Sequence, residues 1–549
     1  MKKLFLFLFI TPLASQELVD VLWDKKNLTN PYNYNELSEY IEGGSEIISD
    51  FNGRISLTSP LGNGFTILVD DYNIFEASHK KIPEFSIEIY SKNNNIIPSN
   101  TGLIKTSHPF WDIQFGIGKA YYHKEQSSTV LLMPFSLMHK NANCVHTGVS
   151  IFALDQFKNL SNIIFQIASE TCAYYKFDYV SIYKANYEDL PLKDSILELV
   201  SSDQISSSFD KIYDSHQIKS NSFGDSNSFK PQNMTLYGLI DGNEHFQSPC
   251  ITRLGNNIFC SEVVLPSYSL AKSIAGTLSL ALLAKKYKDI SQLNVSELVP
   301  QCKDRKWSNI TIEDLSDMST GQYFSSDHDY DESSIAMTNF LFTAETHKEK
   351  LAIACDAFPR KRKPGKTFVY HTSDTYLLGS ALNNFLTENT NDSDYFIDLL
   401  NPFLKLYGLS SISQHSLRTN DETLTPYTGF GMYFNSNDLF QLSQILHSFK
   451  NNSDPAFSFL YNGLNPSYEN SLAAIKRANI YYNNGFWSKV FDKDIFGCQK
   501  DVWIPFMSGF GGITFALLPN GMSYYYFSDG YIYSWEEAVV AAHTMRPFC

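Results

Sequence analysis

The strongest constraint on the fold is a change in the pattern of apolar and polar residues near residue 234. From residue 17 to about residue 200, short apolar segments alternate with clusters of Asn, Ser, Gly and Lys, which is typical of β-strands and turns. Beyond the change, a long helical run covers Ser269 to Lys286, and helices and strands then alternate to the end. The length of 549 residues and the change of sequence pattern together predict two folding units.

The first unit is predicted to be a β-rich accessory domain over residues 17–200, and a sandwich is one arrangement that fits it. We find no catalytic constellation in it. The polar, Ser- and Asn-rich stretch 201–233 is the predicted linker region, with room for a short helix. The predicted strands of the first unit include Arg54–Leu57, Phe65–Val69, Phe85–Tyr90, Val130–Pro134 and Val149–Leu154.

The second unit, residues 234–549, is predicted to be of the α/β (α+β) class. Strand-like runs cover Met234–Ile240 and Ile258–Leu265 at its start. Helices packed on a sheet that draws strands from both ends of the unit fit this order. The end of the unit carries a predicted strand pair, Ile513–Leu518 and Ser523–Phe527, and a predicted C-terminal helix, Ser534–Thr544.

The first 16 residues predict a signal peptide and therefore a periplasmic or secreted protein. Two lysines follow Met1, an apolar run extends from Leu4 to Leu13, and the small residues Ala14 and Ser15 come next. The run is shorter than the roughly 20 apolar residues that span a membrane. No later segment is long and apolar enough to span one either, so we expect no integral membrane segment.

Eight cysteines fit an exported protein, because disulfides persist in oxidising compartments. Pairing of sequence neighbours is the simplest hypothesis, and free buried thiols are the alternative. The neighbour hypothesis joins Cys144 to Cys172, Cys250 to Cys260, Cys302 to Cys355 and Cys498 to Cys549.

No cofactor, metal or nucleic acid is predicted as a partner. The Cys and His residues lack zinc spacing, and no glycine cluster has the surroundings of a dinucleotide site. The formal charge of −15 repels a phosphate backbone. A small-molecule substrate is the remaining expectation.

One candidate nucleophile begins the helical run of the second unit. Ser269 and Lys272 form a Ser-x-x-Lys motif, and the i, i+3 spacing places both side chains on one helical face. The helix that follows, Ile274 to Leu283, is apolar all round and should be buried. Burial lowers the pKa of a lysine and prepares it to take a serine proton. A helix-capping serine beside a solvated lysine is the ordinary alternative.

Four further segments follow the Ser-x-x-Lys motif in an order that resembles the serine β-lactamase and penicillin-binding protein superfamily. Together the five motifs are similar to its class C, esterase and 6-aminohexanoate-dimer hydrolase-like branch. The resemblance covers about residues 234–549. The four segments are Ile310 to Gly321, Pro364 to Gly379 with Tyr370 inside it, Gly429 to Leu439, and Met507-Ser508-Gly509-Phe510-Gly511-Gly512.

The resemblance implies an antiparallel sheet flanked by helices and acyl transfer through a seryl ester. Ser269 would be the acylated nucleophile, and its backbone N–H would form an oxyanion hole with that of Phe510. Lys272 would accept the serine proton or hold the general base. Tyr370 would relay a proton to the leaving group, as phenolate or through its hydroxyl. Gly509, with the two glycines after Phe510, would let the backbone approach a ligand.

The substrate contacts implied by the resemblance are Thr372, Met507, Ser508 and Gly509, and two of them depart from the family pattern. Thr372 stands where the family carries Asn. Met507 stands where β-lactamases and D-peptidases carry a cation for the substrate carboxylate, which a thioether cannot replace. The expected activity is therefore hydrolysis of an ester or simple amide. A D-peptidase or β-lactamase-type enzyme, and a non-catalytic binding protein on the same fold, remain as alternatives.

Two weaker signals stay open. The acidic segment Ser325–Glu332 reads as a solvated loop, a substrate-facing rim or a calcium loop, although the EF-hand glycine is missing. Gly485-Phe486-Trp487 either packs within a strand or places aromatic rings at a pocket mouth.

Overall fold

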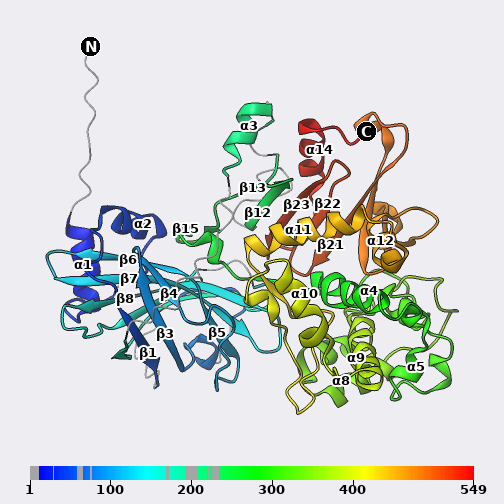
Figure 1. The fold of residues 1–549 in the computed structure, drawn as a ribbon, viewed down its shortest axis with the longest axis horizontal. Coiled ribbons are helices and arrows are strands. Elements are labelled where there is room, and N and C mark those ends of the chain that lie inside the picture. The colour runs from blue at the N-terminus through cyan, green and yellow to red at the C-terminus, as the bar shows by residue number, and fades with distance from the viewer. Residues whose placement is uncertain are drawn as a thin grey trace.

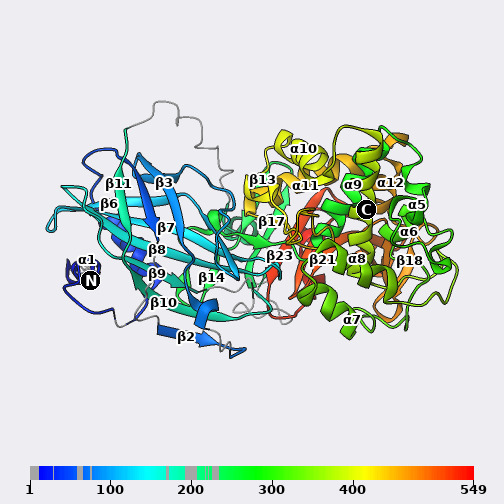
Figure 2. The same cartoon turned by 90° about the horizontal axis from the view of Figure 1, so that it is seen from below.

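The computed structural model describes most of the chain as two lobes that lie side by side (Figures 1 and 2). The N-terminal lobe runs from helix α1 to strand β11, and the C-terminal lobe from strand β12 to helix α14. Residues 1–11 of the predicted signal peptide and most of the predicted linker lie outside the described residues. Those described are 12–28, 30–58, 66–73, 77–168, 172–191, 207–216, 218–219, 222–224 and 234–549.

One continuous 11-stranded sheet forms the N-terminal lobe, instead of the two separate sheets of a sandwich. Its order is β11-β1-β3-β4-β6-β7-β8-β9-β10-β2, with β5 paired to β7, and each pairing is antiparallel. The strands are β1 (Asn52–Leu57), β2 (Thr66–Asp70), β3 (Phe85–Lys92), β4 (Asn95–Pro98), β5 (Trp111–Phe115), β6 (Gly118–His123), β7 (Ser128–His139), β8 (Val145–Asp155), β9 (Ile163–Ile167), β10 (Phe177–Tyr183) and β11 (Asn186–Asp189).

Both faces of the two central strands are buried. Helices α1 (Pro12–Leu22) and α2 (Tyr34–Gly43) cover one face, where Leu18 and Leu22 pack against Val130 and Val149. Side chains on the opposite face form a second apolar core, which includes Leu131. Burial on both faces explains why β7 and β8 read as nearly unbroken apolar runs.

The sheet of the C-terminal lobe is built from both ends of its sequence, as predicted. Strand β12 (Met234–Asp241) pairs with β23 (Met522–Ser528) in the antiparallel order β13-β12-β23-β22-β21-β20-β19-β18. The remaining strands are β13 (Glu244–Gln247), β18 (Leu472–Ile475), β19 (Ile480–Asn483), β20 (Phe486–Phe491), β21 (Val502–Gly509) and β22 (Ile513–Leu517).

Helices cover both faces of this sheet. Helix α14 (Glu536–Met545) packs on one face through Ala538 and Val539, against Ile504 and Phe506. The larger helical layer covers the other face. Its main members are the π-helical segment η5 (Lys272–Leu278), α4 (Ser279–Ala284), α9 (Thr372–Asn389), α11 (Ser436–Lys450) and α12 (Ser458–Leu464).

The predicted strand over Ile258–Leu265 is wrong. The chain forms a 3₁₀ turn at Cys260–Glu262, and only Leu265–Pro266 (β16) pairs, with Tyr433–Phe434 (β17). The turn is held because Cys260 is bonded to Cys250, and because Glu262 accepts a 2.9 Å hydrogen bond from the Ile117 N–H.

The neighbour pairing of all eight cysteines is confirmed. The four disulfides join Cys144 to Cys172, Cys250 to Cys260, Cys302 to Cys355 and Cys498 to Cys549. The first lies in the N-terminal lobe, where it ties the start of β8 to the segment before β10.

The short helix α3 (Asp210–His216) lies within the predicted linker.

The two lobes share contacts of several kinds. The Arg253 guanidinium pairs with the Asp178 carboxylate, and Lys176 lies 3.0 Å from an Asp529 carboxylate oxygen. Val145 of the N-terminal lobe belongs to the main apolar core of the C-terminal lobe. The N-terminal lobe is therefore packed onto the C-terminal lobe through both polar and apolar contacts.

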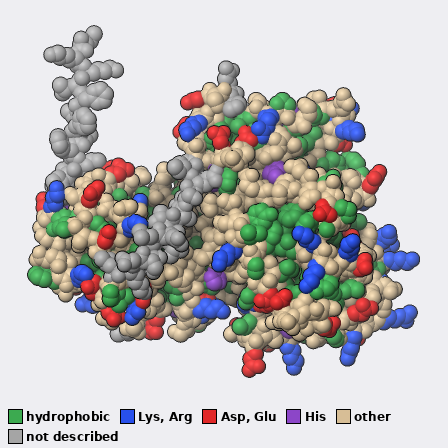
Figure 3. Space-filling model, in the orientation of Figure 1, with side chains coloured by type: hydrophobic (Ala, Val, Ile, Leu, Met, Phe, Trp, Pro, Cys, Tyr) green, Lys and Arg blue, Asp and Glu red, His purple; other side chains and the backbone are tan. Residues whose placement is uncertain are grey.

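On the face drawn in Figure 3, basic and acidic side chains are interspersed over both lobes and do not form one basic stripe. Among the described residues, no helix has the length and apolar character required to cross a membrane.

Candidate active site

The candidate nucleophile, Ser269, follows a residue held in an unfavourable backbone conformation. Tyr268 has φ of 40°, in the left-handed region that bulky side chains rarely adopt. Its N–H donates a 2.7 Å hydrogen bond to the Asn143 side-chain oxygen, and Asn143 is fully buried. Asn143 belongs to the turn between β7 and β8, so a residue of the N-terminal lobe fixes the turn that presents Ser269.

Three predicted residues meet at the Ser269 hydroxyl. The Tyr370 hydroxyl donates to Ser269 Oγ over 2.7 Å, and Lys272 Nζ lies 3.2 Å from the same oxygen. Lys272 reaches it from the first turn of the buried helix, as the i, i+3 spacing predicts. A nucleophile with two proton-exchanging partners within hydrogen-bond distance has the arrangement that acyl transfer requires.

Lys272 is buried and held in a fixed position. Its ammonium group also donates to Thr372 Oγ1 over 2.9 Å and to the Gly429 carbonyl over 2.8 Å. Burial lowers the pKa of Lys272 to about 8, while the nearby carboxylates of Glu332 and Asp374 act in the opposite direction. Gly429 is required here, because an added Cβ would lie 2.8 Å from the Thr372 methyl carbon.

Tyr370 acts as a neutral phenol at neutral pH. Burial raises the pKa of Tyr370 well above its ordinary value, and the charge of Glu332 raises it further. The ring stacks on Trp487 with centroids 5.7 Å apart. The hydroxyl, and not a phenolate, is therefore the form that faces Ser269.

A carboxylate supports this arrangement from behind Thr372. Glu332 accepts a 2.9 Å hydrogen bond from the Thr372 N–H and a second, short one from the Thr372 hydroxyl. The Thr372 hydroxyl thus accepts from Lys272 and donates to Glu332, so its orientation is determined. Burial raises the pKa of Glu332, while Lys272 and the Thr372 donors oppose that effect.

His371, which lies between Tyr370 and Thr372 in the sequence, is held between two aspartates. Its Nε2 lies 3.1 Å from an Asp331 oxygen, and its Nδ1 lies 3.7 Å from an Asp374 oxygen. Burial alone would lower the pKa of His371, but the hydrogen bond to Asp331 and the nearby charge of Asp374 outweigh it and raise the pKa to about 9. The adjacent carboxylates of Asp331 and Glu332 therefore bind His371 and Thr372, the two residues that follow Tyr370.

The two predicted oxyanion donors lie where the sheet approaches the nucleophile turn. A Cβ added at Gly509 would stand 3.0 Å from the Ser267 carbonyl oxygen, so a larger residue would be crowded at the end of β21. The next residue, Phe510, enters a tight turn in which Gly511 and Gly512 have φ of 86° and 102°. Within the described part of the chain, the N–H groups of Ser269 and Phe510 donate to no backbone acceptor.

A cavity of about 650 Å³ opens over Ser269. Three of the four residues predicted to contact substrate, Thr372, Ser508 and Gly509, line it. Met507 does not, because alternation along β21 turns its side chain to the other face, where it is 1% exposed within the main core. Aromatic side chains are frequent in the lining: Tyr174, Tyr268, Phe342, Tyr370, Phe430, Trp487, Phe506, Phe510, Tyr531, Tyr533 and Trp535.

The structure decides the two open signals of the sequence. His328, Asp329 and Glu332 line the cavity, so part of the acidic segment faces the site. The Asp331 oxygens are used by the protein itself, accepting from the N–H groups of Phe324 and Ser325. Trp487 lines the cavity as well as packing within β20.

Sequence reasoning missed Glu332, Asn143 and Tyr174 as contributors to the site. The sequence did point to Glu332, since a substrate-facing rim was one of the interpretations of the acidic segment Ser325–Glu332. Asn143 and Tyr174 had none, because they lie in the N-terminal lobe, more than 90 residues before Ser269.

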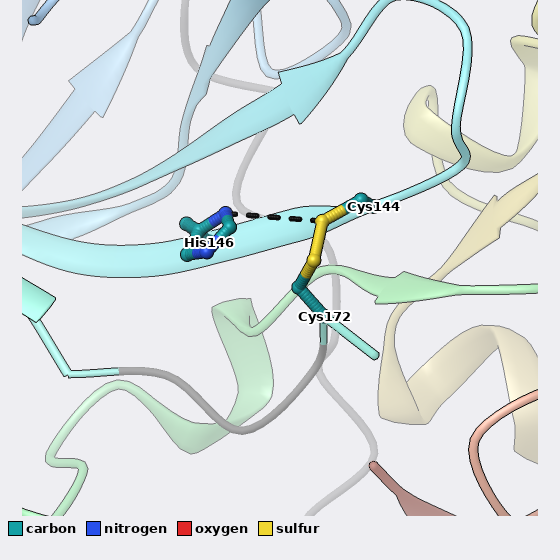
Figure 4. A group of neighbouring side chains, drawn as sticks. All are labelled: Cys144, His146 and Cys172. Carbon is teal, nitrogen blue, oxygen red and sulfur yellow. Dashed lines mark hydrogen bonds between the residues drawn. A yellow bond between two sulfur atoms is a disulfide. The ribbon is translucent and has the colours of Figure 1, made fainter. Parts of the chain in front are cut away.

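One group of described residues has the spacing of metal ligands, and its members are not among the residues that line the cavity over Ser269. Ligand atoms of Cys144, His146 and Cys172 lie within 4.8 Å of one another. The two sulfur atoms are joined to each other in a disulfide, with His146 Nδ1 at 4.0 Å from Cys144 Sγ (Figure 4). A cysteine binds a metal only as a thiolate, and both cysteines are oxidised here, so this group is a disulfide with a buried histidine beside it.

No protein-family model and no curated protein sequence matches the chain. Solved structures do match. A structure assigned as a 6-aminohexanoate-dimer hydrolase from Bacillus anthracis has a TM-score of 0.42 and 14% identity, covering 57% of this chain and 78% of its own. A class C β-lactamase has a TM-score of 0.41 and 14% identity, covering 61% and 95%. A D-alanine carboxypeptidase from Burkholderia cenocepacia has a TM-score of 0.37 and 11% identity, covering 57% and 93%.

These structures are of the kinds that the five sequence motifs resemble. At such TM-scores the likeness carries no weight for activity. Evidence for the function comes from the side chains around Ser269.

Proposed function

We propose that this protein is an exported serine hydrolase that cleaves an ester or amide bond through a covalent seryl ester. The observation that carries the proposal is the meeting of Lys272 Nζ and the Tyr370 hydroxyl at Ser269 Oγ, at 3.2 Å and 2.7 Å. A capping serine has no need of a buried lysine and a buried tyrosine on its hydroxyl.

In the acylation step, the Ser269 proton moves to the neutral amine of Lys272 while Oγ bonds to the substrate carbonyl carbon. The carbonyl oxygen becomes negative and accepts hydrogen bonds from the N–H groups of Ser269 and Phe510. One donor of this kind is worth about 2.7–4 kcal/mol in other hydrolases. The bond to the leaving alcohol or amine then breaks, and the Tyr370 hydroxyl protonates it. The proton held by Lys272 restores the phenol.

In the deacylation step, water attacks the seryl ester at the same carbonyl carbon. The water proton passes to Lys272 as the new carbon–oxygen bond forms. Ser269 Oγ then leaves, takes that proton back and releases a carboxylic acid. With a pKa of about 8, Lys272 is neutral in roughly a tenth of the molecules at pH 7, which is enough to serve as a base.

Glu332 and Thr372 support Lys272 in this scheme as positioning residues. The Thr372 hydroxyl, at the position where the family carries Asn, is a direct partner of the lysine. Since that hydroxyl donates to Glu332, it presents a lone pair to Lys272. The Asn-to-Thr departure is therefore compensated by a carboxylate from a different segment.

The charges around the cavity favour an uncharged substrate over a carboxylate. Lys489 of the lining pairs with Glu536 at 3.1 Å, and His328 lies 2.7 Å from an Asp329 oxygen. Lys272 is used by the network described above. Recognition of a β-lactam or D-alanine carboxylate thus has little support, which makes the penicillin-recognising alternative weaker.

Export is proposed on the predicted signal peptide, and four disulfides are compatible with it. An oxidising compartment, the periplasm or the medium, is where such bridges persist.

The test is intact-protein mass after exposure to a fluorophosphonate probe, with wild type beside Ser269→Ala and a penicillin in a parallel sample. The proposal predicts one adduct on wild type, none on Ser269→Ala and none from penicillin. A penicillin adduct would establish the penicillin-recognising alternative. Absence of labelling in folded wild type would favour a non-catalytic binding protein.

A further inference from the structure

The N-terminal lobe builds one wall of the cavity over Ser269. Asn141 and Ala142, in the turn between β7 and β8, and Tyr174, just before β10, line the cavity directly. The disulfide between Cys144 and Cys172 joins these two segments covalently. The cavity is therefore incomplete without the N-terminal lobe.

Tyr174 is placed against the proposed oxyanion hole. Its ring stacks on Phe510 with centroids 4.9 Å apart and planes 13° from parallel, and Phe510 carries one of the proposed oxyanion donors. The Phe342 ring also packs against Tyr174, nearly perpendicular to it, with ring centroids 5.1 Å apart. Since Phe510 is 38% exposed, the aromatic surface continues into the cavity beside the reacting carbonyl.

The position of Tyr174 is fixed from several directions. The Ala173 carbonyl accepts hydrogen bonds from the hydroxyls of Tyr72, at 3.1 Å, and Tyr531, at 2.9 Å. Asn141 donates to the Phe342 carbonyl over 3.1 Å and accepts from the Tyr427 hydroxyl over 3.1 Å. A wall bonded to both lobes is preorganised for binding.

The wall carries no charge. Its members are Asn141, Ala142, Tyr174, Leu341, Phe342 and Phe510. The carboxylates and cations of the lining come from other segments of the C-terminal lobe. An aromatic surface without a charged side chain recognises a neutral, flat, apolar group by stacking and burial.

Geometry assigns this wall to the acyl part of the substrate. The leaving group must meet the Tyr370 hydroxyl, and Trp487 stacks on Tyr370, so the leaving group lies on the side of the cavity that carries these two rings. The acyl group then lies along the remaining wall, next to Phe510.

We propose that Tyr174, together with Phe342 and Phe510, forms a subsite for a neutral aromatic acyl group, at the junction of the two lobes. This proposal rests on the proposed function, because the acyl group is defined by the ester that Ser269 forms. It makes the β-rich lobe a specificity element of the hydrolase.

The experiment compares two esters with the same leaving group, p-nitrophenyl phenylacetate and p-nitrophenyl acetate. The ratio of their kcat/KM values is measured for wild type, Tyr174→Ala, Tyr174→Phe and the control Phe157→Ala, which removes a ring that is 75% exposed in the same lobe. The ratio within one preparation does not depend on how much of that preparation is folded. Ring stacking predicts that Tyr174→Ala lowers the ratio roughly three- to tenfold.

The proposal further predicts that Tyr174→Phe and Phe157→Ala keep the wild-type ratio. An equal fall of both kcat/KM values in Tyr174→Ala, with an unchanged ratio, would overturn it.

A binding measurement separates the subsite from the chemistry. Ser269→Ala is titrated by calorimetry with N-methyl-2-phenylacetamide and with N-methylacetamide. The phenyl compound should bind Ser269→Ala, and it should bind several-fold more weakly to the double variant that also carries Tyr174→Ala. Equal binding by both proteins would overturn the subsite. If the fluorophosphonate fails to label wild type, the proposed function fails, while this titration still decides the subsite.

Discussion

The buried side-chain oxygen of Asn143 accepts a 2.7 Å hydrogen bond from the N–H of Tyr268, the residue before the proposed nucleophile. The Asn143 amide group also donates to the Met432 carbonyl over 3.1 Å. One side chain of the N-terminal lobe thus joins the Ser269 turn to the segment that follows Gly429. A residue held at φ of 40° needs such support.

We expect Asn143→Ala to lower the rate of fluorophosphonate labelling of Ser269 by about tenfold or more. The substitution leaves the buried Tyr268 N–H without its acceptor, which costs about 1–3 kcal/mol. Asn143→Asp keeps that acceptor and should recover part of the rate. The labelling rate is measured at a temperature where circular dichroism shows all three proteins folded. Equal rates in wild type and Asn143→Ala would show that Asn143 does not position Ser269.

The kcat/KM of wild type should rise with pH through an apparent pKa of about 8. The neutral amine of Lys272 is the base, so activity is low when the lysine is protonated and increases as it loses its proton. Lys272→Ala should lose at least about a thousandfold in kcat/KM. The check is a pH–rate profile with a p-nitrophenyl ester. A flat profile between pH 6 and 9 would contradict the role of Lys272.

Glu332→Gln should move that acidic limb to lower pH. The Glu332 carboxylate raises the pKa of Lys272, so its removal makes the neutral amine available at lower pH. Asp374, which also raises the pKa of Lys272, stays in place in this variant. Asp327→Asn, an exposed change in the same acidic segment, should leave the limb where it is. A limb that stays in place in Glu332→Gln would remove Glu332 from the network.

Thr372 should tolerate serine but not valine. Thr372→Ser keeps a hydroxyl that accepts from Lys272 and donates to Glu332, whereas Thr372→Val leaves both partners without it. We expect a loss of about tenfold to a hundredfold in kcat for Thr372→Val, and little change in KM, because the lost contact serves the base and not the substrate. Steady-state kinetics of the two variants side by side provide the check, and equal activity would argue against this contact.

Acid should destabilise the N-terminal lobe through its buried histidines. Burial lowers the pKa of His139 and of His146 from 6.5 to about 3, so both are neutral in the folded protein at pH 5 and mostly protonated when it unfolds. Stability is therefore lost as pH falls from 6.5 towards 3. At pH 5 the loss is about 2 kcal/mol for each histidine.

Thermal unfolding followed at pH 7 and pH 5 measures this effect. His146→Gln, which removes one titrating group, should show a smaller fall in melting temperature between the two pH values than wild type does. An identical fall would locate the acid sensitivity elsewhere.

Much of the site could be predicted from sequence because its determinants are local. Ser269 and Lys272 are one helical turn apart, and Tyr370 lies within a recognisable segment. The pairing of the cysteines followed from their order along the chain. The sheet built from β12 and β23 followed from apolar runs at both ends of the unit.

The remaining features depend on contacts between distant segments. Asn143 and Tyr174 reach the site only because the N-terminal lobe packs against the nucleophile turn, and no sequence period records that contact. Met507 was expected to contact substrate, but the alternation along β21 places it in the core. The strand expected at Ile258–Leu265 failed because a disulfide and the Glu262 contact fold that segment into a turn.

The central claim is that Ser269 forms a covalent ester during turnover. The most direct measurement is rapid acid quenching of wild type during hydrolysis of p-nitrophenyl phenylacetate, followed by peptide mapping with mass spectrometry. The proposed mechanism predicts the phenylacetyl mass on the peptide that contains Ser269, and no such mass in Ser269→Ala. Turnover without an adduct on that peptide, or with the adduct on another residue, would contradict it.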